Sequence, residues 1–319
     1  MPPAFEPHRF STHSAPEHAR IGLWQEQFGR NMLRVDVKPV ADGGFHADAT
    51  LRAFPGLRTI NCATSVGVHY DRTKALLADG DDSIGIVVNL GPRAVVSHRG
   101  EEVVLGQGDA LPIFTDAAAE LTATRHLGLL FPRSALAERV RDLGNLPVRK
   151  LPRGSQPLRL LTSYFRAMND KALLTNPAWR GTAVRHIQDL AALVLGPHDV
   201  ETSLSAVAAA RLAAVLELIR QRCHEPDLSA AAIARSQNIS PRYLHRLIET
   251  TGKSFTAHVN ELRLAHAYAL LRDGANRERI SDIALQSGFS DISYFNRLFR
   301  ARFGDTPGAV RDVSGRRAD

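Results

Sequence analysis

The feature that most constrains the fold of this chain is a repeat in its C-terminal third. Two short motifs recur fifty residues later and a set of apolar residues recurs after fifty-one, so the second copy carries one inserted residue. The matched positions are Ile233-Ala234 with Ile283-Ala284, Asn238-Ile239-Ser240 with Gly288-Phe289-Ser290, and Leu244, Leu247 and Ile248 with Phe295, Leu298 and Phe299. Two copies of one pattern predict two copies of one supersecondary unit.

The residues at the centre of each copy predict a short helix, a tight turn and a second helix. Asn238 and Gly288 are residue types that tolerate a positive φ in the turn. Ser240 and Ser290 are favourable N-caps for the helix that follows. Pro241 suits the first helical position, where the missing N–H has no intrahelical partner to lose. In the second helices the apolar residues recur at three- and four-residue spacing, so the residues between them must face outward.

The outward face of each second helix carries residue types that can recognise base edges in the major groove. Arg pairs bidentately with guanine and Asn with adenine. Two such helices on one chain could contact two successive major-groove segments about 34 Å apart, with residues 255–271 as a helical spacer. An ordinary helical bundle with exposed arginines is the alternative, and the second aligned copy argues against it.

Longer motifs extend the pattern over residues 211–311. In the first copy they are Leu228-Ser229-x3-Ile233-Ala234, Ser240-Pro241-Arg242-Tyr243-Leu244-His245-Arg246-Leu247, Gly252-Lys253-Ser254-Phe255 and Arg263-Leu264-x2-Ala267. In the second they are Ile280-x2-Ile283-Ala284-x3-Gly288-Phe289-Ser290-Asp291-x-Ser293-Tyr294-Phe295-x-Arg297-x-Phe299-Arg300 and Phe303-Gly304-x-Thr306-Pro307. On these motifs the region closely resembles the double helix-turn-helix domain of the AraC/XylS transcription regulators. Ile248 stands where an aromatic residue is more usual.

The resemblance implies a role for individual residues and for partners. The base-reading positions fall on Arg242, His245 and Arg246 in the first unit and on Ser293, Asn296 and Arg297 in the second. The phosphate contacts fall on Ser240, Lys253, Arg300 and Thr306, since helix N-termini and cations position the protein without specifying sequence. The partners it implies are double-stranded operator or promoter DNA, RNA polymerase and a second copy of the chain in a homodimer.

The N-terminal half has a different pattern. Short β-type runs, such as 57–65, 84–90 and 110–114, are separated by turn residues over residues 40–132. Such spacing predicts an antiparallel sandwich or small barrel. Over residues 133–196 the period becomes helical and ends at Gly196-Pro197. The predicted fold class is α+β with two domains: a β-barrel with flanking helices, then an all-α double helix-turn-helix domain.

This half resembles the AraC-type effector-binding domain, a cupin-like barrel with a helical dimerisation region. The resemblance rests on Tyr70-Asp71-Arg72-Thr73, on the run 84–90 ending in Gly91, and on Leu105-x-x-Gly108-Asp109. It implies a small organic effector, with aromatic molecules among the candidates. We expect an effector-binding and dimerisation domain over residues 1–198, a linker over 199–210 and a DNA-binding domain over 211–319. An apolar stripe either packs on the barrel of its own chain or forms a dimer seam: Val184, Ile187, Leu190, Ala191 and Val194.

A pocket for an organic effector needs apolar walls and one or two polar anchors. The candidate anchors are Arg52, Arg58, His69 and Arg99, with a solvated surface position as the alternative for each. Metal-dependent cupins need a His-x-His pair with further ligands, whereas the histidines of this half stand singly, so we expect no metal and no cofactor. No nucleophile elbow, phosphate-binding glycine loop or His-Glu-x-x-His motif occurs, and we therefore expect no catalytic residues.

Composition supports the same class of protein. The 319 residues are 44% hydrophobic and 23% charged with a formal net charge of +7, which suits a soluble globular protein that can bind nucleic acid. No run of 18 apolar residues and no apolar leader segment occurs, so we expect no membrane association. The two cysteines exclude a disulfide framework and favour a reducing cytoplasm. The family resemblance implies a bacterial cytoplasm, with nucleoid association on binding DNA.

These observations together predict a ligand-responsive, sequence-specific DNA-binding transcription regulator, and the family resemblance alone implies that it is an activator. Two alternatives remain open at this point. One is a constitutive DNA-binding protein without an effector, and the other is a cupin-type enzyme fused to a DNA-binding domain.

Overall fold

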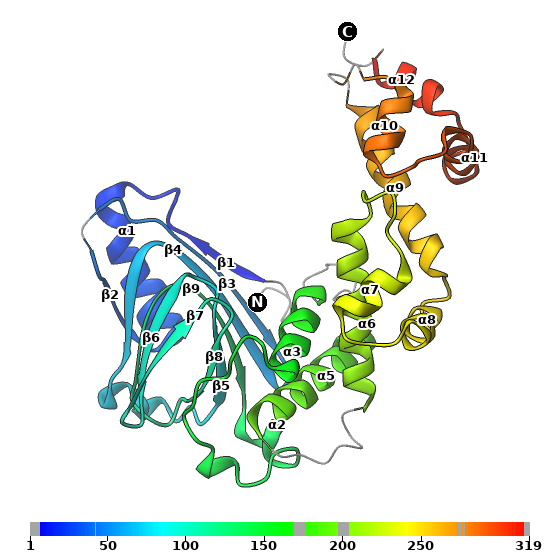
Figure 1. Cartoon of the computed structure of the whole chain (residues 1–319). Helices are drawn as coiled ribbons and strands as arrows, with labels where there is room; N and C mark the ends of the chain where they lie inside the picture. The colour runs from blue at the N-terminus through cyan, green and yellow to red at the C-terminus, as the bar shows by residue number, and fades with distance from the viewer. Residues whose placement is uncertain are drawn as a thin grey trace. The chain divides into compact units, whose positions relative to one another are not determined.

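An antiparallel sheet dominates the first half of the computed structural model (Figure 1). The structure describes residues 7–41, 43–168, 177–196, 204–273, 276 and 278–315. Within them the sheet has nine strands: β1 (His8–Ser11), β2 (Asp36–Pro39), β3 (Ala47–Phe54), β4 (Leu57–Arg72), β5 (Ile84–Asn89), β6 (Arg93–His98), β7 (Glu101–Gly106), β8 (Ala110–Phe114) and β9 (Ala119–Phe131).

Two long strands organise this sheet. β4 and β9 pair from Arg58 opposite Leu130 to Arg72 opposite Ala119, with an irregularity between Ala63 and Val68. One half of this pair is flanked by β3 and β5, and the other half by β2 and β6. Because each long strand changes neighbours along its length, the sheet curves around an interior, as a β-bulge allows.

The sheet begins before residue 40, the start of the range 40–132 that was predicted from the sequence. β1 and β2 precede residue 40, and four-residue strands are too short to show a clear alternation of polar and apolar residues. Two helical segments, α1 (Glu17–Leu23) and the π-helical η1 (Trp24–Leu33), lie between them. Trp24 and Phe28 of η1 are fully buried in a core cluster with Val37 and Tyr70 of the sheet.

The predicted apolar stripe lies inside the first unit. After the short helices η2 (Lys74–Asp79), α2 (Arg133–Ala137) and η3 (Leu143–Asn145) of the loops, α3 (Gln156–Ala167) packs against α5 (Pro177–Leu195). The Gln188 side chain donates to the Gly56 carbonyl at 3.0 Å, which ties α5 to the β3–β4 turn. All five stripe residues are at most 7% exposed within one chain, so the interpretation of the stripe as a dimer seam was wrong.

The second unit is helical throughout its described residues. Its helices are α6 (Leu204–Arg222), α7 (Ala230–Ser236), α8 (Pro241–Glu249), α9 (Phe255–Arg272), α10 (Ile280–Gln286), α11 (Ile292–Phe303) and α12 (Pro307–Gly315). Two core clusters fill it. α9 contributes Phe255 and Val259 to the first and Leu264, Ala267 and Leu271 to the second. The predicted spacer is therefore one continuous helix shared by both cores.

The chain divides into units of residues 1–209 and 210–319. With a sheet-rich first unit and a helical second unit, the predicted two-domain α+β fold class is confirmed. The expected linker, 199–210, needs a correction, because residues 204–210 are the first turns of α6, whose small and apolar sequence contains no helix breaker. Residues 199–203 lie outside the described residues. Among the helices described, none is both long and apolar enough to cross a bilayer.

Candidate DNA interface and effector cavity

The first helix-turn-helix unit consists of α7, a turn and α8. Asn238 adopts a φ of 52° in the turn, as its residue type predicts. Ser240 caps α8, since its hydroxyl oxygen accepts a hydrogen bond from the Tyr243 amide at 3.2 Å. Leu244, Leu247 and Ile248 are buried on one face of α8, which turns the opposite face to solvent.

The second helix-turn-helix unit, which consists of α10, a turn and α11, repeats this geometry with one difference at the cap. Gly288 takes the positive φ of the turn, at 91°. The N-cap of α11 is Asp291, whose carboxylate accepts from the Tyr294 amide at 2.9 Å, and the prediction of Ser290 as the cap was wrong. Asp291 lies fifty-one residues after Ser240, so the inserted residue precedes the cap and pushes Ser290 into the turn.

The expected base-reading residues occupy matched positions on the two helices. Arg242, His245 and Arg246 of α8 and Ser293, Asn296 and Arg297 of α11 are all exposed. In each unit the last of the three, an arginine, lies over the ring of the tyrosine three residues earlier. The Cζ atom of Arg246 is 4.9 Å from the centroid of the Tyr243 ring, and that of Arg297 is 5.4 Å from the Tyr294 ring. The tyrosine ring contacts the flat face of the guanidinium and uses none of its N–H groups. The N–H donors of the arginine therefore remain directed outward.

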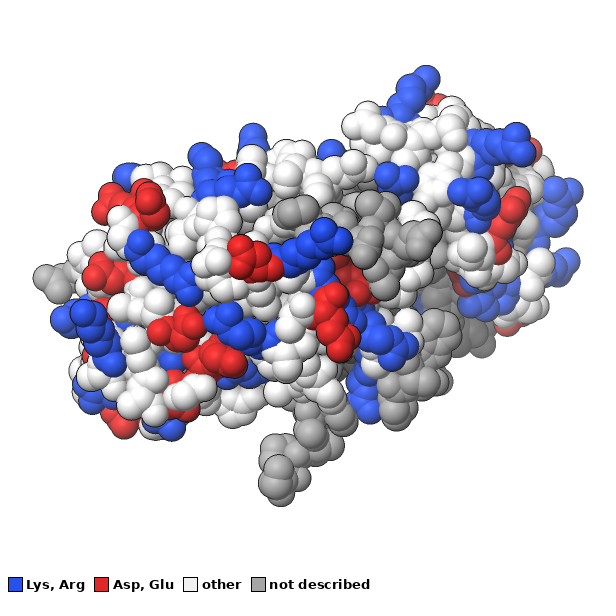
Figure 2. All heavy atoms as spheres, turned by 90° about the horizontal axis from the view of Figure 1, so that it is seen from below, with Lys and Arg blue, Asp and Glu red and all other residues white. Residues whose placement is uncertain are grey.

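The expected phosphate contacts are also at the surface. Ser240, Lys253, Arg300 and Thr306 are exposed. Lys253 forms an ion pair with Glu261 at 2.5 Å, and this contact lowers the pKa of the Glu261 carboxyl. Thr306 accepts from the Ala309 amide at 3.2 Å and so caps α12. On the face seen in Figure 2, Lys and Arg side chains are spread over both units, with Asp and Glu side chains among them.

The sheet unit contains a cavity of about 130 Å³ that is partly open to solvent. Its walls are mostly apolar, with Met32, Leu33 and Val35 contributed from the end of η1 and Val87, Val96, Ile113, Leu121 and Leu130 from the sheet. The polar side chains in the lining are those of Arg58, Tyr70, Arg72, Asp81, Thr115, Glu120 and His126. An apolar pocket with a few polar groups is the usual form of a small-molecule site.

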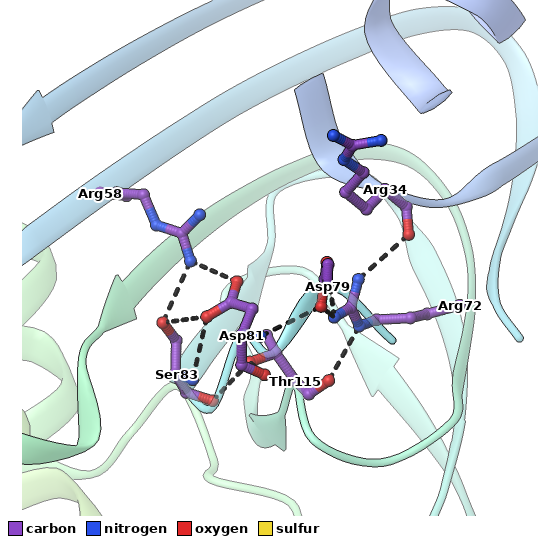
Figure 3. A network of polar contacts seen from close by, with 7 residues as sticks. All are labelled: Arg34, Arg58, Arg72, Asp79, Asp81, Ser83 and Thr115. Carbon is purple, nitrogen blue, oxygen red and sulfur yellow. Dashed lines mark hydrogen bonds and ion pairs between the residues drawn. The ribbon is translucent and has the colours of Figure 1, made fainter. Parts of the chain in front are cut away.

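Arg72 joins three segments beside this cavity (Figure 3). Its guanidinium donates to the Thr115 carbonyl at 2.9 Å, to the Arg34 carbonyl at 3.1 Å and to both carboxylate oxygens of Asp79, at 2.8 and 3.1 Å. These hydrogen bonds lower the pKa of the Asp79 carboxyl. Arg72 is 7% exposed, and a buried guanidinium with this many partners holds the end of η1 and the end of η2 beside the sheet.

Of the four expected effector anchors, Arg58 lines the cavity. It donates to the Asp81 carboxylate at 2.5 Å and to the Ser83 hydroxyl at 3.0 Å (Figure 3). His69 lies on β4 next to Tyr70, so it points to the opposite face of the strand, where its Nδ1 is 3.0 Å from the Thr122 hydroxyl.

The other two expected anchors are not among the residues that line the cavity. Arg52 is half-buried on β3, and burial and the nearby charge of Arg9 lower its pKa. Arg99 lies in the two-residue β6–β7 turn with a φ of 50°, and its guanidinium lies 3.6 Å from the centroid of the Phe114 ring. A hairpin turn lies at the end of the two strands that it joins, and Arg99 is not among the strand residues that line the cavity.

Of the polar side chains in the lining, only that of Arg58 was predicted from the sequence, and Tyr70, Arg72 and His126 are among those that were missed. Tyr70 is buried, and its hydroxyl lies 3.2 Å from the Cys62 thiol. Burial raises the pKa of Cys62 to about 12 and that of Tyr70 well above its usual value. His126 meets the Tyr70 ring edge-on, with centroids 5.2 Å apart, and burial lowers its pKa to about 4. In the described residues, no three His, Cys, Asp or Glu side chains gather as a metal site requires.

Comparison with known proteins decides the family. A family profile described as an AraC-binding-like domain matches residues 24–196, and one described as a helix-turn-helix domain matches residues 233–312. The chain belongs to the AraC/XylS family of transcription regulators. The resemblance of both halves to this family, predicted from sequence, is thereby confirmed, and the comparisons indicate no catalytic function.

Relatives in the AraC/XylS family match over different lengths. The transcriptional activator RhrA of Rhizobium meliloti is 28% identical over 242 residues, which cover 74% of this chain and 75% of RhrA. The regulator GlxA of the same organism is 39% identical over 105 residues, so the match spans 33% of this chain and 32% of GlxA. The crystal structure of the AraC-like transcriptional activator CuxR covers 88% of this chain with a TM-score of 0.50 at 22% identity, and shows the fold.

We expect Arg297→Ala to weaken binding to the cognate operator by about 1–3 kcal/mol and to relax specificity at one base pair, because it removes one base-edge contact. The matched control is Arg300→Ala on the same helix, which should weaken binding to cognate and scrambled DNA equally. It should also reduce the slope of log affinity against log salt concentration by about 1. Fluorescence anisotropy on both duplexes at several salt concentrations measures these effects. Equal losses of Arg297→Ala on both duplexes would contradict the base-reading role.

Folding stability should fall in acid because of His126. Its pKa is about 4 in the folded chain against an ordinary value of 6.5, so between these pH values the unfolded chain binds more protons. The free energy of unfolding should therefore decrease as the pH falls from 6.5 to 4, by about 2–3 kcal/mol more than in the variant His126→Phe. Urea unfolding of both proteins across this range is the measurement, and parallel pH profiles would show that His126 does not contribute.

Proposed function

We propose that this chain is a ligand-responsive transcriptional activator that binds operator DNA through α8 and α11 and holds a small organic molecule in the cavity of its sheet unit. The observation that carries the proposal is the pairing of these two features in one chain: an apolar cavity with few polar groups, and two helices with matched, exposed base-recognising residues. Arg58 is the expected effector anchor that lines this cavity.

The ligand acts in this proposal by shifting an equilibrium between states of the protein that differ in DNA binding or activation. It can do so only through its different affinity for those states. The segments that Arg72 joins, at the end of η1 and the end of η2, are suited to sense the ligand because they border the cavity.

Activation rather than repression is supported by the names of relatives, since RhrA and the Rhodococcus protein NphR are both described as transcriptional activators. Contact with RNA polymerase and homodimerisation belong to the same proposal and rest on the family. A dimer would use residues other than the buried stripe of α5. Both cysteines are buried free thiols, which suits a reducing cytoplasm.

A ligand screen by thermal shift tests the sensing role. A compound that binds the folded state at 100 times its Kd stabilises it by about 2.7 kcal/mol, so hits should raise the Tm and change transcription from the operator in a reporter assay. The control variant Val87→Phe fills the cavity, and it should lose the shift while it still binds the operator. If no compound shifts the Tm and transcription stays the same with every compound, the chain is a constitutive DNA-binding protein instead.

A further inference from the structure

The size of the cavity limits what it can hold. Its volume of about 130 Å³ is close to that of an engineered apolar cavity of about 150 Å³ that binds benzene. A single ring with one small substituent is therefore of a size that the cavity can hold without rearrangement of its walls.

The two arginines of the lining already have carboxylate partners within the chain. Arg72 is surrounded by the Asp79 carboxylate and two carbonyl groups, and Arg58 pairs with Asp81 (Figure 3). Glu120 adds a further carboxylate to the lining. The carboxylates of Asp81 and Glu120 would repel an anionic ligand in this cavity.

The imidazole of His126 is a polar group of the lining that makes no hydrogen bond with the described residues. The Nδ1 atom of His126 is buried and has no hydrogen-bond partner among the described residues, and the whole residue is 5% exposed. The Tyr70 hydroxyl, by contrast, already lies against the Cys62 thiol. A polar ring in the lining of a cavity that makes no hydrogen bond with the protein is a group that a bound molecule can satisfy.

We infer that the cavity binds an uncharged one-ring organic molecule that forms a hydrogen bond with His126. This inference rests on the proposed sensing role and names the ligand class of the same cavity. Because burial lowers the pKa of His126 to about 4, its ring is neutral at pH 7 and offers one N–H donor and one nitrogen acceptor. A hydroxyl, amide or carbonyl group on the ligand can form a hydrogen bond with this imidazole, and the apolar walls contact the ring of the ligand.

The experiment uses the full chain and three probes of similar size: phenol, benzoate and toluene. Isothermal titration calorimetry at pH 7.5 should show phenol binding, at least tenfold weaker toluene binding, and no benzoate binding. In His126→Phe the affinity for phenol should fall at least tenfold. The matched control is His69→Phe, which removes a histidine from the opposite face of β4 and should leave phenol binding unchanged.

The stability of the unliganded variant separates a ligand-binding role from a structural one. Since His126→Phe removes an unpartnered buried nitrogen, the variant without ligand should have a Tm equal to or above that of the parent. A lower Tm, benzoate binding in place of phenol binding, or phenol binding within twofold of the parent in His126→Phe would each overturn the inference. In those cases a positive result of the thermal-shift screen still supports the sensing role. Failure of all three probes and of the screen removes the sensing role itself.

Discussion

The two DNA-reading units depend on one buried arginine. Arg263 lies in the middle of α9, and its guanidinium donates to the carbonyl oxygens of Cys223 and Glu225, both at 2.6 Å. It also lies 5.8 Å from the centroid of the Phe289 ring in the turn of the second unit. One side chain thus joins the end of α6, the shared helix and the second turn, and α9 cannot rotate relative to either core without breaking these contacts. Burial lowers the pKa of Arg263. The hydrogen bonds to the two carbonyl groups stabilise the buried guanidinium.

Gly288 makes this arrangement possible. A Cβ atom at this position would lie 2.8 Å from the Arg263 Nε and 2.8 Å from the Cys223 carbonyl oxygen, and its φ of 91° disfavours any other residue. Asn238, its counterpart in the first helix-turn-helix unit, is exposed. Its φ of 52° is one that an asparagine can adopt. The repeat is therefore symmetric in its reading helices and asymmetric in the turn that contacts the shared helix.

The sequence allowed the helical unit to be predicted in more detail than the sheet unit. Apolar spacing and turn chemistry identified both second helices and the shared α9, because these signals are local. The cap of α11 was missed since Ser290 and Asp291 are both good caps and the position of the inserted residue decides between them. In the sheet, β4 has buried residues on both faces, so alternation could not show which side chains line a cavity. The roles of Tyr70, Arg72 and His126 depend on contacts between distant segments, which no local pattern encodes.

The central claim is that both reading helices bind one DNA duplex at a fixed separation, because α9 is stiff and anchored at its middle by Arg263. Footprinting and affinity measurements on operators with base pairs inserted between the two half-elements test it most directly. Five added base pairs rotate one half-element by about half a turn of the duplex, so affinity should fall to that of a single unit with non-specific phosphate contacts. About ten added base pairs restore the rotation but not the distance, and affinity should stay low. Undiminished binding to the five-base-pair insertion would contradict the claim and would show that one unit alone reads the operator.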